Sequence, residues 1–349
     1  MAQKPRLSWN RQTLRPRHRF ATSQGGVTEK QTIVVRLEHE GVVGLGEVAP
    51  SKLYGQTLES SEAALGGMAE LIGNDPFRIE SIIASCLGNF DDQRAAIGGL
   101  DSALHDWAAR RWGVPVWRIL GLDRPSVRTT FTIGVAEPDE TRQKVDEALA
   151  AGFTALKVKV GAERDHETLS MIRSRFGGAL FLDANEAWTP GEARRRIADL
   201  ARYRPTMIEQ PLARADWEHL RGLRDLGVAP IFVDESCQRP ADVLRLANAV
   251  DGVNIKFTKC GGIREALRMI WLARGLGLKT MLGCFVSSSL AIAPALSIAS
   301  LVDYCDLDGA LLLADDPFDG IARDGSVISL GGLPGLGVSP AGAALKSHT

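Results

Sequence analysis

Residues 179–185 read Ala-Leu-Phe-Leu-Asp-Ala-Asn, an apolar run that ends at the acidic residue Asp183. The pattern recurs 26 residues later in Met207-Ile-Glu209 and a further 25 residues along in Ile231-Phe-Val-Asp234. Short apolar runs separated by room for one helix are typical of parallel strands in an α/β protein. This repeat decides the fold and also places an acid at the end of each strand.

Eight strand-like segments of this kind follow one another from about residue 128. The residues near their ends, which lie 22 to 26 residues apart, are Thr132, Val158, Asp183, Glu209, Asp234, Lys256, Leu282 and Asp306. This spacing is that of one strand–helix unit, and eight units predict a (β/α)8-type barrel. An open, doubly wound sheet is the alternative, but no Gly-x-Gly-x-x-Gly follows an early strand.

The first third of the chain has a different rhythm. Residues 32–38 and 42–48 predict a β-hairpin, and residues 58–72, 76–87 and 92–112 have helical periodicity. We therefore expect an N-terminal domain over residues 1–125 and the barrel over residues 126–319. The Gly-rich segment 320–349 is not another strand–helix unit, and we expect it to return to the first domain.

Composition bounds the possible functions. The 349 residues carry a formal net charge of −1 and are 45% hydrophobic, which suggests neither nucleic-acid binding nor membrane binding. Residues 1–20 are basic but lack an apolar core, so we expect no secretory signal. The five cysteines form no Cys-x-x-Cys pair and predict buried thiols in a reducing compartment, the cytoplasm.

Three carboxylates at consecutive strand ends predict a metal site. Asp183, Glu209 and Asp234 are in register, and like charges brought together need a cation. Hard oxygen ligands favour Mg²⁺, so we expect one Mg²⁺ ion per subunit. A single acid in such a place is often a helix cap or a loop residue, but three in register are harder to explain in that way.

Lysines on two barrel strands predict acid–base chemistry. Lys157 and Lys159 share one face of their strand, since strand side chains alternate. Because nearby cations favour deprotonation of an ammonium group, we expect Lys159 to act as a general base. Lys256 lies four strands further round and therefore faces Lys159 across the barrel mouth. Two opposed bases suit a racemase or epimerase, while Lys259 is expected to be secondary.

The last barrel strand adds a pair of acids. Asp306 and Asp308 share one face, and they would suit a cationic part of the substrate, such as an ammonium group. A metal ion would stabilise the enediolate that forms when a proton leaves the carbon beside a carboxylate. The alternative for Asp308 is an ordinary Asp-Gly turn.

Over nearly its whole length the chain resembles the enolase superfamily, muconate-lactonizing subgroup, and within it the dipeptide epimerases. The motifs that carry the resemblance include Gly44-Leu-Gly-Glu47, Lys157-Val-Lys159, Asp183-Ala-Asn185, Glu209-Gln-Pro211, Asp234-Glu-Ser236 and Asn254-Ile-Lys256. The resemblance implies an isomerase with an α+β capping domain over a modified (β/α)7β TIM-type barrel. It implies Mg²⁺ on Asp183, Glu209 and Asp234, the catalytic lysines Lys159 and Lys256, and a dipeptide α-ammonium held by Asp306 and Asp308.

The chain departs from this family in two places. Ala-Glu epimerases carry arginines in the capping loop, whereas residues 23–28 here read Ser-Gln-Gly-Gly-Val-Thr. We therefore expect a dipeptide whose second residue is not acidic. The motif around Phe285 also differs, which changes the lining of the pocket. The expected substrate-binding residues are Lys157, Asp306, Asp308, Thr132, Gln24 and Phe285.

Other functions remain open at this point. The same enediolate serves N-acylamino acid racemisation, dehydration as in o-succinylbenzoate synthases, and cycloisomerisation, none of which needs a free substrate ammonium. A noncatalytic metal-dependent binding protein is a further alternative, although it would not need two opposed lysines. No interface can be identified in the sequence, but relatives are often oligomeric, so a homo-oligomer is a further expectation.

Overall fold

A computed structural model describes residues 4–18, 20–22 and 25–342. Its largest sheet has eight parallel strands in the order β7 to β14, each paired with its neighbours in the sequence. The strands are β7 (Phe131–Ile133), β8 (Ala155–Lys159), β9 (Ala179–Asp183), β10 (Met207–Glu209), β11 (Ile231–Val233), β12 (Gly252–Ile255), β13 (Lys279–Gly283) and β14 (Tyr304–Asp306). All eight predicted barrel strands are present.

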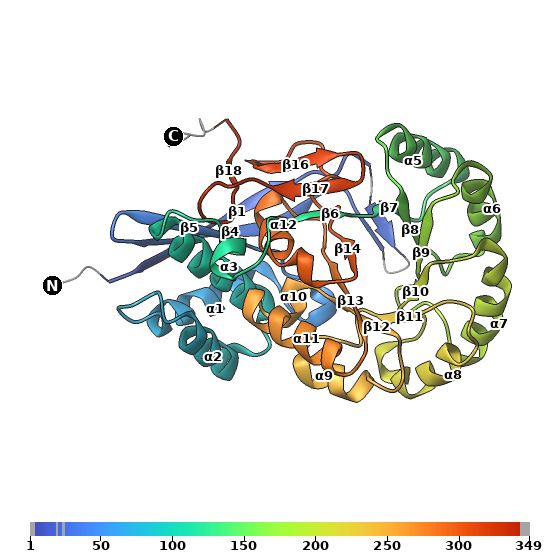
Figure 1. The fold of residues 1–349 in the computed structure, drawn as a ribbon, viewed down its shortest axis with the longest axis horizontal. Helices are drawn as coiled ribbons and strands as arrows, with labels where there is room; N and C mark the ends of the chain where they lie inside the picture. Colours follow the sequence, from blue (N-terminus) through green and yellow to red (C-terminus); the bar gives the residue numbers. More distant parts are fainter. Residues whose placement is uncertain (1–3, 19, 23–24, 343–349) are drawn as a thin grey trace.

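Helices follow the first seven strands and lie outside the sheet (Figure 1). They are α5 (Pro138–Ala150), α6 (Asp165–Arg175), α7 (Pro190–Leu200), α8 (Leu220–Arg224), α9 (Pro240–Leu246), α10 (Phe257–Cys260), α11 (Ile263–Gly275) and α12 (Ser289–Ser297). The first and last strands of the sheet come together at Thr130, the residue directly before β7. Its backbone N donates to Cys305 O on β14 at 3.2 Å. Because no helix follows β14 directly, the predicted (β/α)7β barrel is confirmed.

The interior of the barrel is apolar in its lower part and polar at its C-terminal mouth. Phe181, Met207, Phe232 and Met281 form a small buried cluster inside the sheet. Phe181 lies two residues before Asp183 on β9, so both side chains point inward and Asp183 lies nearer the C-terminal mouth. The lower interior is therefore packed with apolar side chains, and polar side chains are concentrated at the mouth, where this fold places active sites.

An antiparallel sheet and the helices that pack on it make up most of the N-terminal part (Figure 1). They are β1 (Arg6–Leu14), β4 (Lys30–His39), β5 (Val42–Val48), α1 (Leu58–Leu71), α2 (Ile79–Phe90) and α3 (Arg94–Arg111). The predicted hairpin is β4–β5, whereas β1 was not predicted. A Cβ at Gly46 would lie 2.0 Å from Gly99 O, so glycine here lets β5 pack directly on α3.

The chain returns to the N-terminal part after the barrel. The hairpin β16 (Ile321–Asp324) and β17 (Val327–Leu330) pairs with β6 (Ser126–Arg128). Leu336 N then donates to Asp106 on α3 at 2.7 Å. These contacts agree with the expected return of the C-terminal segment, while the domain boundaries at residues 125 and 319 stay a prediction.

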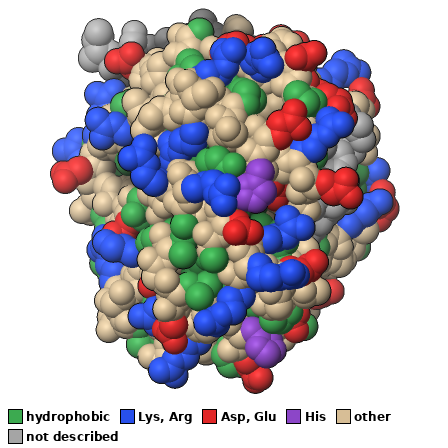
Figure 2. Space-filling view, turned by 90° about the vertical axis from the view of Figure 1, so that its right-hand side faces the viewer, with side chains coloured by type: hydrophobic (Ala, Val, Ile, Leu, Met, Phe, Trp, Pro, Cys, Tyr) green, Lys and Arg blue, Asp and Glu red, His purple; other side chains and the backbone are tan. Residues whose placement is uncertain are grey.

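The described residues contain no helix long and apolar enough to cross a membrane. On the barrel face drawn in Figure 2, basic and acidic side chains are interspersed. All five cysteines are free thiols, and all except the half-buried Cys284 are buried, as expected.

Candidate active site

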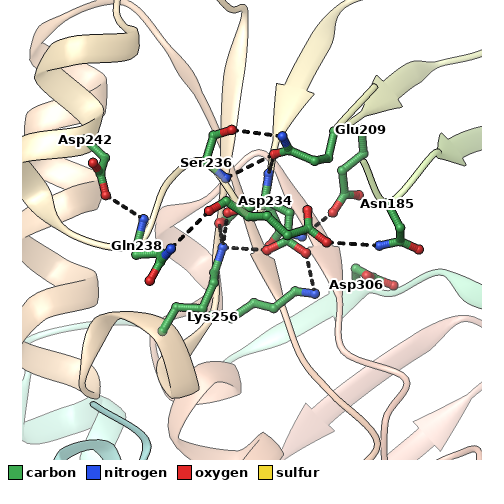
Figure 3. A network of polar contacts seen from close by, with 12 residues as sticks. Asn185, Glu209, Asp234, Ser236, Gln238, Asp242, Lys256 and Asp306 are labelled. Atoms are coloured by element: carbon green, nitrogen blue, oxygen red, sulfur yellow. Dashed lines mark hydrogen bonds and ion pairs between the residues drawn. The ribbon is translucent and has the colours of Figure 1, made fainter. Parts of the chain in front are cut away.

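A cavity of about 900 Å³ lies at the C-terminal ends of the barrel strands, beneath the N-terminal part. Its walls include Lys157, Lys159, Asp234, Lys256, Asp306 and Asp308 from the barrel, together with residues 50–53 and 56–59 from the N-terminal part. Most of the residues predicted from strand ends therefore meet in one place. Figure 3 shows the side chains of Asp234, Lys256, Glu209 and Asp306 pointing toward one another.

Lys157 is the electrostatic centre of one half of the site. Its Nζ lies 2.9 Å from Asp183 Oδ2, 2.9 Å from Glu209 Oε2 and 2.7 Å from Asp306 Oδ2, with only 1% of the side chain exposed. Lys159 Nζ contacts the same Asp183 oxygen at 2.7 Å. The shared oxygen confirms that the two lysines lie on the same face of β8. Ammonium groups therefore bridge the carboxylates on this side.

Asp234 organises the other half. Lys256 Nζ lies 2.7 Å from Asp234 Oδ2, while Lys259 Nζ donates to Asp234 Oδ1, to its carbonyl oxygen and to Asn254 O. A Cβ at Gly283 would lie 2.9 Å from Lys256 Cε, so the glycine at the end of β13 leaves room for this lysine. Lys256 and Lys159 reach the site from strands four positions apart in the sheet, as predicted.

Phe285 and the last strand complete the walls. The ring centroid of Phe285 lies 4.6 Å from Lys256 Nζ, a cation–π contact. Asp306 accepts a hydrogen bond from Thr130 Oγ1 at 2.6 Å, and Asp308 Oδ2 accepts one from Thr132 N at 2.6 Å. The predicted residue Thr132 thus holds Asp308 through its backbone, and its side chain is buried.

The site carries more negative than positive charge. Its carboxylates are Asp183, Glu209, Asp234, Glu235, Asp306 and Asp308, and its ammonium groups are Lys157, Lys159, Lys256 and Lys259. Full ionisation would leave two negative charges uncompensated. Burial, reinforced by Asp234, raises the pKa of Glu235 to about 8. Burial, reinforced by Asp306, raises the pKa of Asp308 to about 7. The surplus charge therefore disfavours ionisation of these two groups.

For the other groups in the site, the direction of the pKa shift depends on the charged partners of each group. Burial alone would raise the pKa of Asp183, but Lys157 and Lys159 lower it to about 2. Burial and the charge of Asp183 raise the pKa of Glu209. Burial opposes the charged form of Lys256, but Asp234 outweighs this effect and the pKa of Lys256 is raised. Without a further cation, Lys256 is therefore held as an ammonium group.

The carboxylates fit a hard divalent cation by charge and by chemistry. Within the described part of the chain, no three acidic, His or Cys side chains form a ready-made metal cluster. Lys157 lies between Asp183 and Glu209 instead. Glu209 Oε2, although 2.9 Å from that lysine, is a buried oxygen that accepts no hydrogen bond from a described residue. A buried acceptor of this kind, in a site with more carboxyl groups than ammonium groups, matches Mg²⁺.

Some residues of the site were not predicted from the sequence, and one predicted residue lies outside the part of the chain that the structure describes. Gln24 lies outside the described residues. Glu235 follows Asp234 directly, and Asn185 donates to it at 3.2 Å. Lys259, expected to be secondary, contacts Asp234 directly. Asn254 donates to Glu209 Oε1 at 2.7 Å, and its place two residues before Lys256 on β12 was the available signal.

Two family profiles match the chain. The profile described as "Mandelate racemase / muconate lactonizing enzyme, N-terminal domain" matches residues 9–121, and "Enolase C-terminal domain-like" matches residues 140–344. The chain belongs to the enolase superfamily. The N-terminal match places it with the mandelate racemase and muconate lactonizing enzymes, as the sequence motifs indicated.

Similar proteins of this superfamily are named as dipeptide epimerases. The L-Ala-D/L-Glu epimerase of Bacteroides thetaiotaomicron is 37% identical over 327 residues, covering 93% of this chain and 85% of that protein. The hydrophobic dipeptide epimerase of Roseobacter litoralis is 38% identical over 337 residues, covering 93% of this chain and 96% of that protein.

Solved structures that resemble this chain include dipeptide epimerases and other racemases. A dipeptide epimerase from Enterococcus faecalis, complexed with Mg and L-Leu-L-Tyr, has a TM-score of 0.92 and 32% identity, covering 97% of this chain and all of that one. An N-succinyl Arg/Lys racemase from Bacillus cereus has a TM-score of 0.92 at 24% identity, covering 97% of this chain and 96% of that one. The second likeness shows that the barrel with its N-terminal domain also serves racemases of other substrates.

Proposed function

We propose that this chain is a Mg²⁺-dependent dipeptide epimerase, an isomerase that inverts the α-carbon of the C-terminal residue through an enediolate. The observation that carries the proposal is the placement of Lys159 and Lys256 on strands four positions apart, facing one cavity that also contains Asp306 and Asp308. Opposed bases favour inversion over elimination, and the acid pair favours a substrate with a free amine. The names of the similar proteins support the same reaction.

Asp183, Glu209 and Asp234 are the proposed ligands of one Mg²⁺ ion per subunit. A bound ion would supply a fixed positive charge for the substrate carboxylate, where negative charge grows as the α-proton leaves. In the structure, Lys157, Lys159 and Lys256 provide the compensating charge for these acids. An added divalent cation would compensate the same carboxylates and so weaken the hold of Asp183 and Asp234 on the two catalytic lysines.

Lys159 and Lys256 transfer the proton. One lysine in its neutral form removes the α-proton from one face of the bound carbon, and the other, as an ammonium group, returns a proton to the opposite face. The bond between carbon and hydrogen breaks and re-forms, and the two lysines end with exchanged protonation states, which proton exchange with solvent restores. Lys157 remains a buried cation beside Asp183 and Glu209 and contributes positive potential next to the substrate carboxylate.

Asp306 and Asp308 are proposed to hold the α-ammonium of the dipeptide. Both are buried, and both line the cavity. Thr132 fixes Asp308 through its backbone N–H, which orients the carboxylate before the substrate arrives. A charge-assisted hydrogen bond in such a site is stronger than a neutral one. A free amine is therefore the feature by which the site would distinguish a dipeptide from an N-acylated amino acid.

The second residue of the dipeptide is proposed to be non-acidic. The described cavity wall includes the apolar side chains of Leu53, Leu58, Phe285, Val286 and Leu312. The capping side also contributes two lysines and two glutamates, Lys30, Lys52, Glu29 and Glu59, so it has no excess of positive charge. A wall of this composition favours an apolar side chain over a carboxylate. Gln24, which lies outside the described residues, is proposed as a substrate-binding residue from the sequence alone.

Three further proposals concern the domain boundaries, the location and the assembly of the protein. We propose a capping domain over residues 1–125 completed by about 320–349, with the barrel over residues 126–319. Free, mostly buried cysteines support a cytoplasmic location. A homo-oligomer is proposed on the precedent of relatives alone.

N-acylamino acid racemisation is the second candidate, because the N-succinyl Arg/Lys racemase has the same fold. A library of dipeptides and N-acylated amino acids, incubated in deuterated water with Mg²⁺ and followed by mass spectrometry, separates the two. We expect deuterium at the C-terminal residue of apolar dipeptides. Incorporation into N-acylated amino acids alone would favour the second candidate. No incorporation into either class would favour a noncatalytic metal-dependent binding protein.

A further inference from the structure

Arg214 connects three loops around the mouth of the barrel. It is the first residue of the 3-10 turn Arg214–His219, which follows β10. Its Nη2 lies 3.1 Å from Glu186 Oε2, its Nε donates to Glu186 Oε1 at 3.2 Å, and its backbone N donates to the same oxygen at 2.6 Å. Glu186 follows β9 and is mostly buried, with 12% of its side chain exposed. These three hydrogen bonds between Arg214 and Glu186 therefore join the loops after β9 and β10.

The same guanidinium group reaches across to the N-terminal part. Its Nη1 donates to Leu53 O at 3.4 Å, and its carbon lies 5.6 Å from the ring centroid of Tyr54. Both partners belong to the 3-10 turn Lys52–Tyr54. This turn closes on itself, since Tyr54 N donates to Ser51 O. Arg214 thus ties a compact turn of the capping part to the barrel.

The turn held in this way forms part of the cavity wall. Leu53 lines the cavity, and the ring of Tyr54 meets the ring of Phe285 edge-on at 6.4 Å. Phe285 in turn lies 4.6 Å from Lys256 Nζ. The position of the turn therefore determines where one apolar wall stands relative to a proposed catalytic lysine.

The backbone beside Glu186 is bent in a way that supports this contact. Glu186 has φ +67°, and the neighbouring residues of the site Asn185 and Gln210 have φ +44° and +40°. Residues other than glycine adopt this region infrequently, and such residues cluster where the surrounding structure fixes them for function. Glu186 N donates to Gln210 O at 3.0 Å, which links the two strained loops.

We propose that Arg214 is a positioning residue for substrate binding. Together with Glu186 it holds the turn 51–55 against the barrel, so that Leu53 and Phe285 enclose the apolar side chain of the dipeptide. Arg214 does not line the cavity, and it acts through Leu53 and Tyr54. The inference rests on the proposed dipeptide substrate, and it adds that affinity for this substrate depends on a contact between the two parts of the chain.

The test compares Arg214→Met and Arg214→Lys with the wild type. The control is Arg164→Met, because Arg164 forms an exposed pair with Glu137 at 2.9 Å elsewhere on the barrel. For an apolar dipeptide we expect KM to rise about tenfold in Arg214→Met while kcat and Mg²⁺ affinity are retained, the signature of lost substrate binding. Arg214→Lys keeps the charge and should recover part of the loss, and Arg164→Met should match the wild type.

Hydrogen–deuterium exchange of the peptide over residues 50–58 gives a second readout that does not require activity. We expect faster exchange there in Arg214→Met and wild-type exchange in Arg164→Met. Wild-type KM in Arg214→Met, with or without faster exchange, would overturn the inference and leave the proposed function intact. If the wild-type protein epimerises no dipeptide, the proposed function fails and this inference fails with it.

Discussion

Lys157, Lys256 and Lys259 are buried at the mouth of this barrel and Lys159 is partly buried there, so each is a local cost to folding. An ammonium group without a partner in a protein interior is strongly disfavoured. Here Lys157 has three carboxylates within 2.9 Å, and Lys259 has three oxygen acceptors. The carboxylates and lysines that compensate one another's charge are also the residues proposed for metal binding and proton transfer. Two of them, Lys159 and Lys256, come from strands four positions apart and are proposed to serve opposite faces of one carbon.

Replacing either of the two lysines proposed to be catalytic should separate exchange from inversion. In Lys159→Ala or Lys256→Ala we expect inversion to fall roughly 10³-fold, since positioned general bases contribute about 10²–10⁴-fold. Each variant should still exchange the α-proton of one stereoisomer, because the remaining lysine serves one face. Chiral chromatography together with NMR in deuterated water measures both rates. Lys279→Ala, at the opposite end of the barrel strands, is the control. Full inversion in either variant would contradict the two-base assignment.

Glu47 is a buried acid that the proposed chemistry does not use. It extends from β5 to α12, where Ser288 N and Ser288 Oγ donate to it. Burial raises the pKa of Glu47 to about 7, although the hydrogen bonds from Ser288 oppose this shift. In the unfolded chain a glutamic acid titrates near ~4.3. The folded state therefore binds this proton more tightly than the unfolded state does.

This difference gives stability a defined pH dependence. Because the folded pKa is the higher one, the free energy of unfolding should fall as pH rises from about 4.3 to about 7. Between pH 5 and 8 the loss should be about 2–3 kcal/mol, and Glu47→Gln should lack it. Urea unfolding at both pH values measures the difference. Glu137→Gln, with its side chain 84% exposed in the wild type, is the control. Equal pH dependence in Glu47→Gln and wild type would rule out the assignment.

At the scale of elements, the strand ends were the predictable part of the site. An apolar run with one polar residue at its C-terminal end identifies a barrel strand and its functional residue together, as in Asp183 on β9. Lys259 could not be placed in this way. The chain turns into α10 directly after Lys256, and this helical turn brings the Lys259 side chain back to Asp234. A strand-based alternation cannot predict that contact.

The missed strand β1 has a similar cause. Arg6–Leu14 contains four charged or amide side chains and no run of β-branched residues, so it resembles a basic tail in the sequence. It forms a strand because it pairs in register with β4, from Arg6 opposite Glu38 to Leu14 opposite Lys30. Pairing with a partner distant in the sequence determines this strand, and local propensity does not show it.

The end of β14 offers a direct test of the substrate's amine. Asp308→Asn removes one negative charge from the proposed ammonium site while keeping an oxygen for Thr132 N. For dipeptides we expect kcat/KM to fall roughly 10- to 100-fold, the value of a hydrogen bond to a charged group. Steady-state kinetics with a dipeptide and its N-acetyl derivative measures the effect.

The control for this experiment lies on the other side of the barrel. Asp303 precedes β14 and pairs with Lys279 at 2.6 Å, away from the cavity. Asp303→Asn should leave kcat/KM unchanged. If Asp308→Asn retains wild-type kcat/KM for dipeptides, the amine is recognised elsewhere and the N-acylamino acid alternative gains support.

At the scale of the whole molecule, the excess of carboxyl groups over ammonium groups in the site predicts that a divalent cation stabilises the fold. Mg²⁺ at about 100 times its dissociation constant should add about 2.7 kcal/mol to the free energy of unfolding, because it binds the folded state alone. Thermal unfolding with and without Mg²⁺ measures this. Asp183→Asn should lose the effect, and Asp146→Asn, in an exposed pair with Arg175, should keep it. An equal Mg²⁺ effect in Asp183→Asn would place the ion elsewhere.

The central claim is proton transfer at the α-carbon of a dipeptide's C-terminal residue, with inversion. The most direct measurement is NMR of an apolar L,L-dipeptide incubated with the Mg²⁺-loaded protein in deuterated water. The account predicts that the α-proton signal of the second residue disappears while the L,D-epimer accumulates with deuterium at the same carbon. An unchanged spectrum across a set of apolar dipeptides, or exchange confined to the N-terminal residue, would contradict it.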